Sequence, residues 1–174
     1  MNVPFLPPVA TFDGHESALV WAKQWRSDCI DHFAELEATI ADVLESLAAR
    51  RKLGVKVKTG LLFRPAFDEL MRLTGPKGSF VKECCNIPIS LAELNRQLDW
   101  RAHLTHGTLD VWQGRKGVWL ITLRHREVNS GGPVRWFAIP RAEAERICAE
   151  LETEVRKLKQ RASAMLGKSI RESD

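Results

Sequence analysis

The sequence lacks the patterns that mark membrane-spanning, secreted and zinc-binding proteins. No apolar run approaches the roughly 20 residues that cross a bilayer. The first residues, MNVPFLPPVATFDG, contain three prolines and no basic segment followed by an apolar one, so we expect no signal peptide. The four cysteines form no C-x-x-C pair and no His/Cys cluster with zinc spacing. We therefore expect a cytoplasmic protein with reduced thiols, no metal site and no cofactor.

Composition favours one packed domain over residues 1–174. Hydrophobic residues make up 44% of the chain and charged residues 28%, which is enough apolar material for a core. The net charge of +4 is a mild bias toward anionic partners such as RNA. Much of this excess lies in one basic run, a candidate RNA-binding segment that consists of Arg50, Arg51, Lys52, Lys56 and Lys58. A solvated loop explains the same run nearly as well.

Apolar residues recur at three- and four-residue steps in four segments, which predicts four helices. Their expected limits, taken from capping residues, proline and glycine, are Asp13 to Arg50, Pro65 to Gly75, Leu91 to His106, and Pro140 to residue 166. Three of these helices thus fall within residues 13–106. Outside the helices we expect an extended arm at 1–12, a β insertion at 108–139 and a tail at 167–174.

The third predicted helix has the strongest local signals. Ser90 and Glu93 form an S-x-x-E capping box, and Ile89 and Leu94 occupy the two positions of a hydrophobic staple. Gly107 lies where a left-handed C-terminal cap is expected. These signals predict one continuous helix that ends at the glycine.

Residues 108–139 predict three short strands, because branched and aromatic residues gather at 108–112, 118–123 and 134–139. The turn sequences QGRKG and NSGGP separate the strands. With short or moderate connections between the helices, the whole pattern predicts a mainly α fold. We expect an antiparallel helical bundle with a small antiparallel β insertion before the last helix.

One pair of side chains in this layout suggests chemistry. Arg101 and His106 lie in the run LDWRAHLTHG at the end of the third predicted helix. Steps of about 100° per residue place them roughly 140° apart, on either side of an apolar stripe. A two-fold axis that joined two chains along this stripe would create a cleft with two arginines and two histidines. The stripe consists of Leu91, Leu94, Leu98 and Ala102.

Such a set of side chains suits metal-free cleavage of RNA. A base removes the proton of the 2′-hydroxyl, an acid protonates the 5′ leaving oxygen, and cations stabilise the charged transition state. Histidine serves as acid or base near neutral pH, and arginine offers a permanently charged fork that suits phosphate. His106 is therefore the candidate acid or base, and Arg101 the candidate transition-state cation.

The run WRAHLTHG, placed between an amphipathic helix and a small hairpin followed by a final helix, resembles the HEPN superfamily (higher eukaryotes and prokaryotes nucleotide-binding). That family has an α-helical core and a signature of arginine, four to six residues, then histidine, often followed by glycine. The resemblance covers the helical layout from about residue 16 to 166, and Arg101 and His106 are the positions that carry over. It implies a homodimeric, metal-independent endoribonuclease of the toxin–antitoxin or phage-defence (abortive-infection) type. A cognate antitoxin is then a candidate partner.

Other interpretations stay open. Ala102 stands where the family often has a polar residue, and non-catalytic relatives serve as modules that bind RNA, a nucleotide or a partner protein. Such a module is the alternative function, and a purely structural dimer is a third. His103 either assists at the site or faces solvent, and we expect the second. Four tryptophans either stack RNA bases or pack the sheet onto the helices, and we expect packing: Trp100, Trp112, Trp119 and Trp136.

Overall fold

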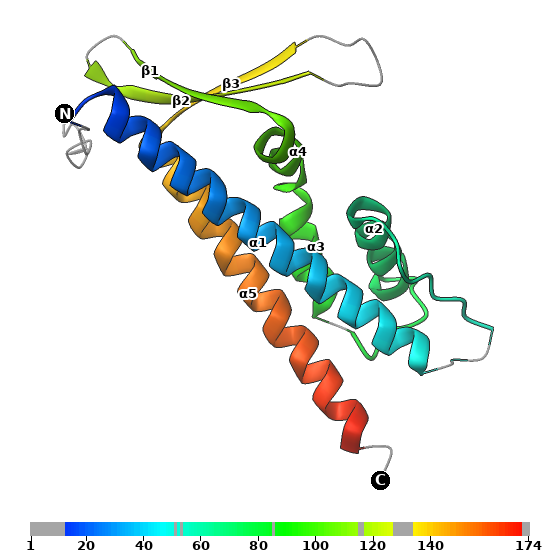
Figure 1. Ribbon diagram of the computed structural model, residues 1–174. Helices are drawn as coiled ribbons and strands as arrows, with labels where there is room; N and C mark the ends of the chain where they lie inside the picture. Colours follow the sequence, from blue (N-terminus) through cyan, green and yellow to red (C-terminus); the bar gives the residue numbers. More distant parts are fainter. Residues whose placement is uncertain are drawn as a thin grey trace, which may run out of the picture. The chain divides into compact units, whose positions relative to one another are not determined.

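The computed structural model describes residues 13–50, 52, 54–84, 86–114, 117–126 and 134–171. The elements in chain order are α1 (His15–Ala49), α2 (Phe63–Thr74), α3 (Ile87–Asn95), α4 (Leu98–His106), β1 (Thr108–Gln113), β2 (Trp119–Arg126), β3 (Val134–Pro140) and α5 (Arg141–Arg171) (Figure 1). The protein is mainly helical with a small antiparallel sheet before the last helix, which confirms that part of the predicted fold. The arm expected at 1–12 lies outside the described residues.

The chain divides into two compact units. The first unit comprises Met1–Ile30 and Asp99–Glu150, and the second comprises Asp31–Leu98 and Leu151–Asp174. The two long helices, α1 and α5, therefore each contribute one part to either unit. Arg101 and His106 belong to the first unit, and the basic run from Arg50 to Lys58 belongs to the second.

The core of the first unit joins α1, α5 and the sheet. Its buried side chains recur at helical spacing on the helices and alternate along the strands: Ala18, Ala22, Trp25, Cys29, Leu104, Val111, Ile121, Leu123, Ile139, Ala144 and Ile147. The indole nitrogen Nε1 of Trp25 donates a hydrogen bond of 2.7 Å to the carbonyl oxygen of Ala144. This bond ties α1 to the first turn of α5 from inside the core.

The sheet has the strand order β1-β2-β3, with both pairs antiparallel (Figure 1). Its register places Leu109, Leu123 and Phe137 opposite one another in one row across the three strands. Because side chains alternate between the two faces of a strand, Ile121, Leu123 and His125 share one face of β2. Ile121 and Leu123 are buried, so this is the face that packs on the helices. The three strands lie where the sequence predicts them.

The core of the second unit is a set of apolar stripes on α1, α2 and α5. Its buried members include Phe33, Leu36, Ile40, Val43, Leu44, Leu47, Phe67, Leu70, Leu73, Leu151, Val155, Leu158, Ala162 and Met165. On α1 and α5 these are the positions that the three- and four-residue periodicity selects. The stripes predicted for the two long helices are therefore confirmed.

A buried carboxylate fixes the segment before α2 in the second unit. Glu69 is only 6% exposed, and both of its oxygens accept hydrogen bonds of 2.8 Å from the guanidinium of Arg72. The backbone N–H of Lys58 donates to the same carboxylate at 3.1 Å. These charge-assisted bonds lower the pKa of Glu69 below its usual range, with the Arg72 bond as the largest cause.

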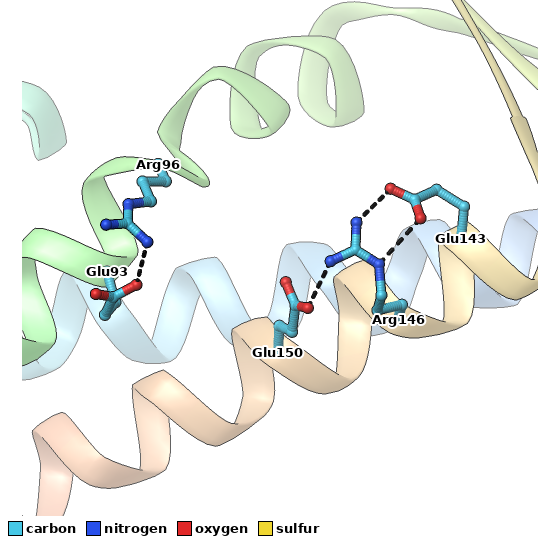
Figure 2. A network of polar contacts seen from close by, with 5 residues as sticks. All are labelled: Glu93, Arg96, Glu143, Arg146 and Glu150. Atoms are coloured by element: carbon cyan, nitrogen blue, oxygen red, sulfur yellow. Dashed lines mark hydrogen bonds and ion pairs between the residues drawn. The ribbon is translucent and has the colours of Figure 1, made fainter.

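Exposed ion pairs line the first turns of α5. The guanidinium of Arg146 bonds Glu143 at 2.5 Å and Glu150 at 2.6 Å, one turn away on either side (Figure 2). The bond to Arg146 lowers the pKa of Glu143, and the two carboxylates raise that of the guanidinium. All three side chains face solvent, so these pairs support the helix locally and add no tertiary contact.

The predicted single helix from Leu91 to His106 is wrong, and the described residues form five helices where four are expected. The backbone N–H groups of Arg96 and Gln97 bond to carbonyls only three residues back, which interrupts the α-helical ladder between α3 and α4. α3 begins earlier than expected, with Asn86 as its N-cap and Pro88 in its first turn. Ser90 therefore lies inside α3, where it is buried and accepts a hydrogen bond from Arg161.

The staple and the stripe predicted for that helix are also wrong. Ile89 is 56% exposed, so it does not pack against Leu94 as a staple would. Leu91, Leu94 and Leu98 are buried in the core of their own chain, which leaves no stripe for a second chain to cover. Ala102 is exposed, on the opposite side of α4 from buried Leu104.

The limits of the other helices lie close to those predicted. α1 begins directly after Gly14, and α2 begins two residues before Pro65. Gly75 ends α2 as predicted, with its N–H bonded to the carbonyl of Met71. α5 continues past the predicted end near residue 166, so most of the expected tail is helical. In the described part of the chain, no helix has the length and apolarity that a membrane span needs.

Candidate functional site

Arg101 and His106 both lie on α4, and their surroundings differ. His106 is the last residue of the helix and is exposed, whereas Arg101 is half-buried. The hydroxyl of Thr105 donates a hydrogen bond of 2.7 Å to the carbonyl of Arg101. Arg26 of α1 donates from Nη2 to the carbonyl of Thr105 at 3.3 Å, which anchors the C-terminal turn of α4 to α1. The histidine is thus presented from a turn held by tertiary contacts.

The exposed residues of α4 form one face of the helix. They are Asp99, Ala102 and His106, at spacings of three and four. Arg101 lies roughly 140° from His106 around the helix axis, so the two side chains of one chain start in different directions. A second chain that docked on this exposed face would contact His106 directly.

Gly107 is required by a close approach, and the left-handed cap predicted for it is wrong. Its N–H bonds the carbonyl of His103 at 2.9 Å, which continues the helical pattern, and its φ is not positive. A Cβ atom at this position would lie 2.2 Å from the same carbonyl oxygen. The chain therefore passes from α4 into β1 with no room for a side chain at Gly107.

The expectation that His103 faces solvent is wrong. Its side chain is only 4% exposed. The imidazole ring lies 4.3 Å from the ring of Phe137 and 5.4 Å from that of His125, edge to face with the latter at 87°. His103 is therefore a packed residue between α4 and the sheet, where it holds His125 in position.

His125 is the site residue that the sequence reasoning missed. Its ring centroid lies 6.1 Å from that of His106, with 31° between the two ring planes. The antiparallel register pairs Thr108, the first residue of β1, with Arg124 of β2. The chain just before Thr108, where α4 ends, therefore lies opposite His125, the residue after Arg124. Its alternation with Ile121 and Leu123 on the core-facing side of β2 was the available signal. The result is two neighbouring imidazoles, one exposed and one half-buried.

The four tryptophans divide into two pairs, so the packing role expected for all of them is wrong for one pair. Trp100 packs on Phe137 with ring centroids 5.1 Å apart, and Trp119 contacts His15 at 6.0 Å. Trp112 and Trp136 are 62% and 61% exposed. The exposed pair does not join the sheet to the helices.

The basic run is a structural segment of the second unit as much as a charged one. Arg50 donates to the carbonyl of Met165 at 3.3 Å and is half-buried. Lys52 donates to the carbonyl of Ser79 and, at 3.0 Å, to the carboxylate of Glu83. These bonds tie the side chains of Arg50 and Lys52 to other segments of the second unit.

The other members of the run are exposed or lie outside the description. The side chains of Lys56 and Lys58 are exposed, while their backbone groups bond Arg72 and Glu69. Arg51 lies outside the described residues. Lys56 and Lys58 are thus the described members whose charges face solvent.

Among the residues that the structure describes, thiols and acidic groups do not add a second cluster. Burial, together with the neighbouring Cys148, raises the pKa of the Cys29 thiol. Within the described residues, no three His, Cys, Asp or Glu side chains are placed to share one metal ion.

Comparisons of the chain with protein-family models, curated proteins and solved structures find no match.

Proposed function

We propose that this chain is a metal-independent endoribonuclease of the HEPN type, acting as a homodimer in a toxin–antitoxin or phage-defence role. The observation that carries the proposal is the exposed imidazole of His106 with the imidazole of His125 6.1 Å away. Two adjacent imidazoles supply the acid and the base that metal-free RNA cleavage requires. The resemblance of the run from Arg101 to Gly107 to the HEPN signature supports the same activity.

In the proposed reaction, one imidazole is neutral and the other protonated. The neutral ring accepts the proton of the 2′-hydroxyl as that oxygen attacks phosphorus. The protonated ring donates its proton to the 5′ oxygen as the bond from phosphorus to that oxygen breaks. The products are a 2′,3′-cyclic phosphate and a free 5′-hydroxyl, and the two rings have exchanged protonation states.

A second chain completes the proposed site by supplying the arginine. Arg101 and His106 start in different directions on one helix, so the arginine that meets a given histidine comes from the partner. The exposed face formed by Asp99, Ala102 and His106 is the proposed contact, and a two-fold axis there creates two equal sites. An arginine beside the developing negative charge stabilises the transition state.

Cleavage of RNA by the purified protein in EDTA tests this function. We expect His106→Ala, Arg101→Ala and His125→Ala each to lower the rate by about 100-fold or more, the usual size of acid–base and charge-stabilising effects. His32→Ala, in the second unit, is the matched control and should cleave like the wild type. Equal rates in all four variants, or loss of activity on chelation, would sink the proposal. Growth arrest on expression of the wild type but not of His106→Ala tests the toxin role.

Mixing two inactive variants tests the composite site. Half of the dimers formed by Arg101→Ala and His106→Ala chains are mixed, and each has one intact site of two. We therefore expect about a quarter of the wild-type activity after mixing. No recovery, in a protein whose wild type cleaves RNA, would place both residues in the same chain's site.

A non-catalytic RNA-binding module is the second candidate, and the exposure of Trp112 and Trp136 favours it. Such a module binds RNA in a salt-sensitive manner without cleaving it. Ala102, exposed where the HEPN pattern often has a polar residue, fits this candidate as well. The EDTA cleavage assay separates the two functions.

A further inference from the structure

Two large aromatic side chains lie in solvent on the sheet. Trp112 of β1 is 62% exposed and Trp136 of β3 is 61% exposed. An indole buries more apolar surface than almost any other side chain when it is packed, so two exposed indoles on one small sheet are costly to leave without a partner.

The register places both tryptophans on the same outward face. One cross-strand row runs Thr108, Arg124, Trp136, and another runs Trp112, Leu120, Pro140. Leu120 and Arg124, one from each row, are four residues apart on β2 and therefore share a face, which is the face opposite to that of buried Ile121. Both rows, and with them both tryptophans, thus lie on the outward face. Four residues along a strand and two strands across place the backbones of the two tryptophans about 16 Å apart.

Two charged side chains, Arg124 and Asp110, lie on this face. The guanidinium of Arg124 lies 5.5 Å from the ring of Trp136, and none of the described carboxylates forms an ion pair with it. The carboxylate of Asp110, on the same face, accepts a hydrogen bond of 2.8 Å from the N–H of Val111 and lies 4.0 Å from Nε2 of His15. The carboxylate of Asp110 thus lies beside His15 and its own backbone, whereas the exposed guanidinium of Arg124 lies beside Trp136, where a phosphate can reach it.

We propose that this outward face of the sheet binds single-stranded RNA, with two bases stacked on Trp112 and Trp136 and a phosphate paired with Arg124. Aromatic platforms beside arginine bind single strands in this manner because every base has a π-face. A spacing of about 16 Å far exceeds the 3.4 Å between stacked bases, so the strand must be unpaired and unstacked. That the ligand is RNA rests on the function proposed above. In that function this face holds the substrate at a place separate from His106.

A protein partner fits this face less well. A dry protein interface needs a continuous apolar centre. Here the row between the two tryptophans consists of Asp110, Thr122 and Ala138, so the apolar surfaces are separated by polar groups. Two separate indoles, one of them with the guanidinium of Arg124 beside it, suit the alternation of bases and phosphates in a nucleic acid strand.

RNA binding by the full chain in a His106→Ala background tests the proposal, because the strand then stays intact. The probe is a fluorescein-labelled 12-nucleotide RNA of mixed sequence without self-complementarity, and the readout is fluorescence anisotropy. We expect Trp112→Ala and Trp136→Ala each to weaken binding about 5-fold or more. Phe at either position should restore most of the affinity. Val20→Ala, which removes an exposed side chain from α1 in the same unit, is the matched control and should bind unchanged.

Two further arms complete the test. Arg124→Gln should lower the slope of log affinity against log salt by about one. A duplex of the same sequence should bind more weakly than the single strand. Unchanged affinity in both tryptophan variants, or preference for the duplex, overturns the proposal. A tryptophan variant that binds RNA as before but no longer self-associates also overturns it. These results do not depend on cleavage, so a wild type that binds RNA through the tryptophans but never cuts it refutes only the proposed enzyme.

Discussion

Substitution of Gly107 by alanine tests how α4 is joined to the sheet. The added Cβ would lie 2.2 Å from the carbonyl oxygen of His103 and 3.2 Å from its carbon. Close carbon–oxygen contacts in proteins fall at about 3.3–3.6 Å, so the backbone must open by about 1 Å. The atom in the way is backbone, so no side-chain rotation relieves the overlap.

We expect Gly107→Ala to lower the free energy of unfolding by about 1–3 kcal/mol, the usual cost of overpacking. Urea unfolding followed by tryptophan fluorescence measures this change. The substitution should also move His106 relative to His125, and a displacement of about 1 Å can reduce a rate about 100-fold. The RNA cleavage rate in EDTA is therefore the second readout.

Gly167→Ala is the matched control. Gly167 lies inside α5, and nothing within 4 Å would meet its Cβ. Alanine is favoured over glycine inside a helix by about 1 kcal/mol, so this variant should be as stable as the wild type or more stable. If Gly107→Ala unfolded at the same urea concentration as Gly167→Ala, the close approach at His103 would be refuted.

Three more substitutions probe the cores. The pKa of Glu69 is lowered in the folded protein, so its carboxylate stabilises the fold above the unfolded-state pKa near 4.3, and this stabilisation is lost as pH falls through the folded-state pKa. In a plot of the urea unfolding midpoint against pH, Glu69→Gln should therefore flatten the fall on the acid side. Arg72→Ala should destabilise the protein by about 1–3 kcal/mol at pH 7, and a midpoint unchanged in either variant would contradict this role. Trp25→Phe should cost about 1–3 kcal/mol in thermal unfolding through loss of the bond to Ala144, and an unaltered Tm would count against it.

The long helices could be predicted because the periodicity of apolar residues in the sequence matches the positions that are buried. Cys29, Leu36 and Ile40 on α1, and Leu151 and Val155 on α5, are buried at the spacing that selects them. The strands could be predicted for a similar reason, since branched and aromatic residues gather between turn sequences. In both cases the signal lies within one element and needs no knowledge of its partners.

The break between α3 and α4 could not be read in this way. The capping pattern of Ser90 and Glu93 is a local signal, and it falls inside a helix. Ser90 is buried there, and its hydroxyl accepts a hydrogen bond from Arg161, far along the chain on α5. A contact between distant segments thus outweighs a local preference, and no window around Ser90 contains that information.

The candidate site shows the same division between local and distant information. Spacing within one helix singled out Arg101 and His106, but spacing says nothing about which imidazole His106 meets. That neighbour, His125, is set by the register of β1 and β2, which continues directly from α4 through Gly107. A shift of one residue in that register would turn His125 to the outward face and separate the two rings. The chemistry at the end of α4 therefore depends on the hairpin as much as on the helix, and substitutions that disturb the register should abolish activity while His106 itself stays in place.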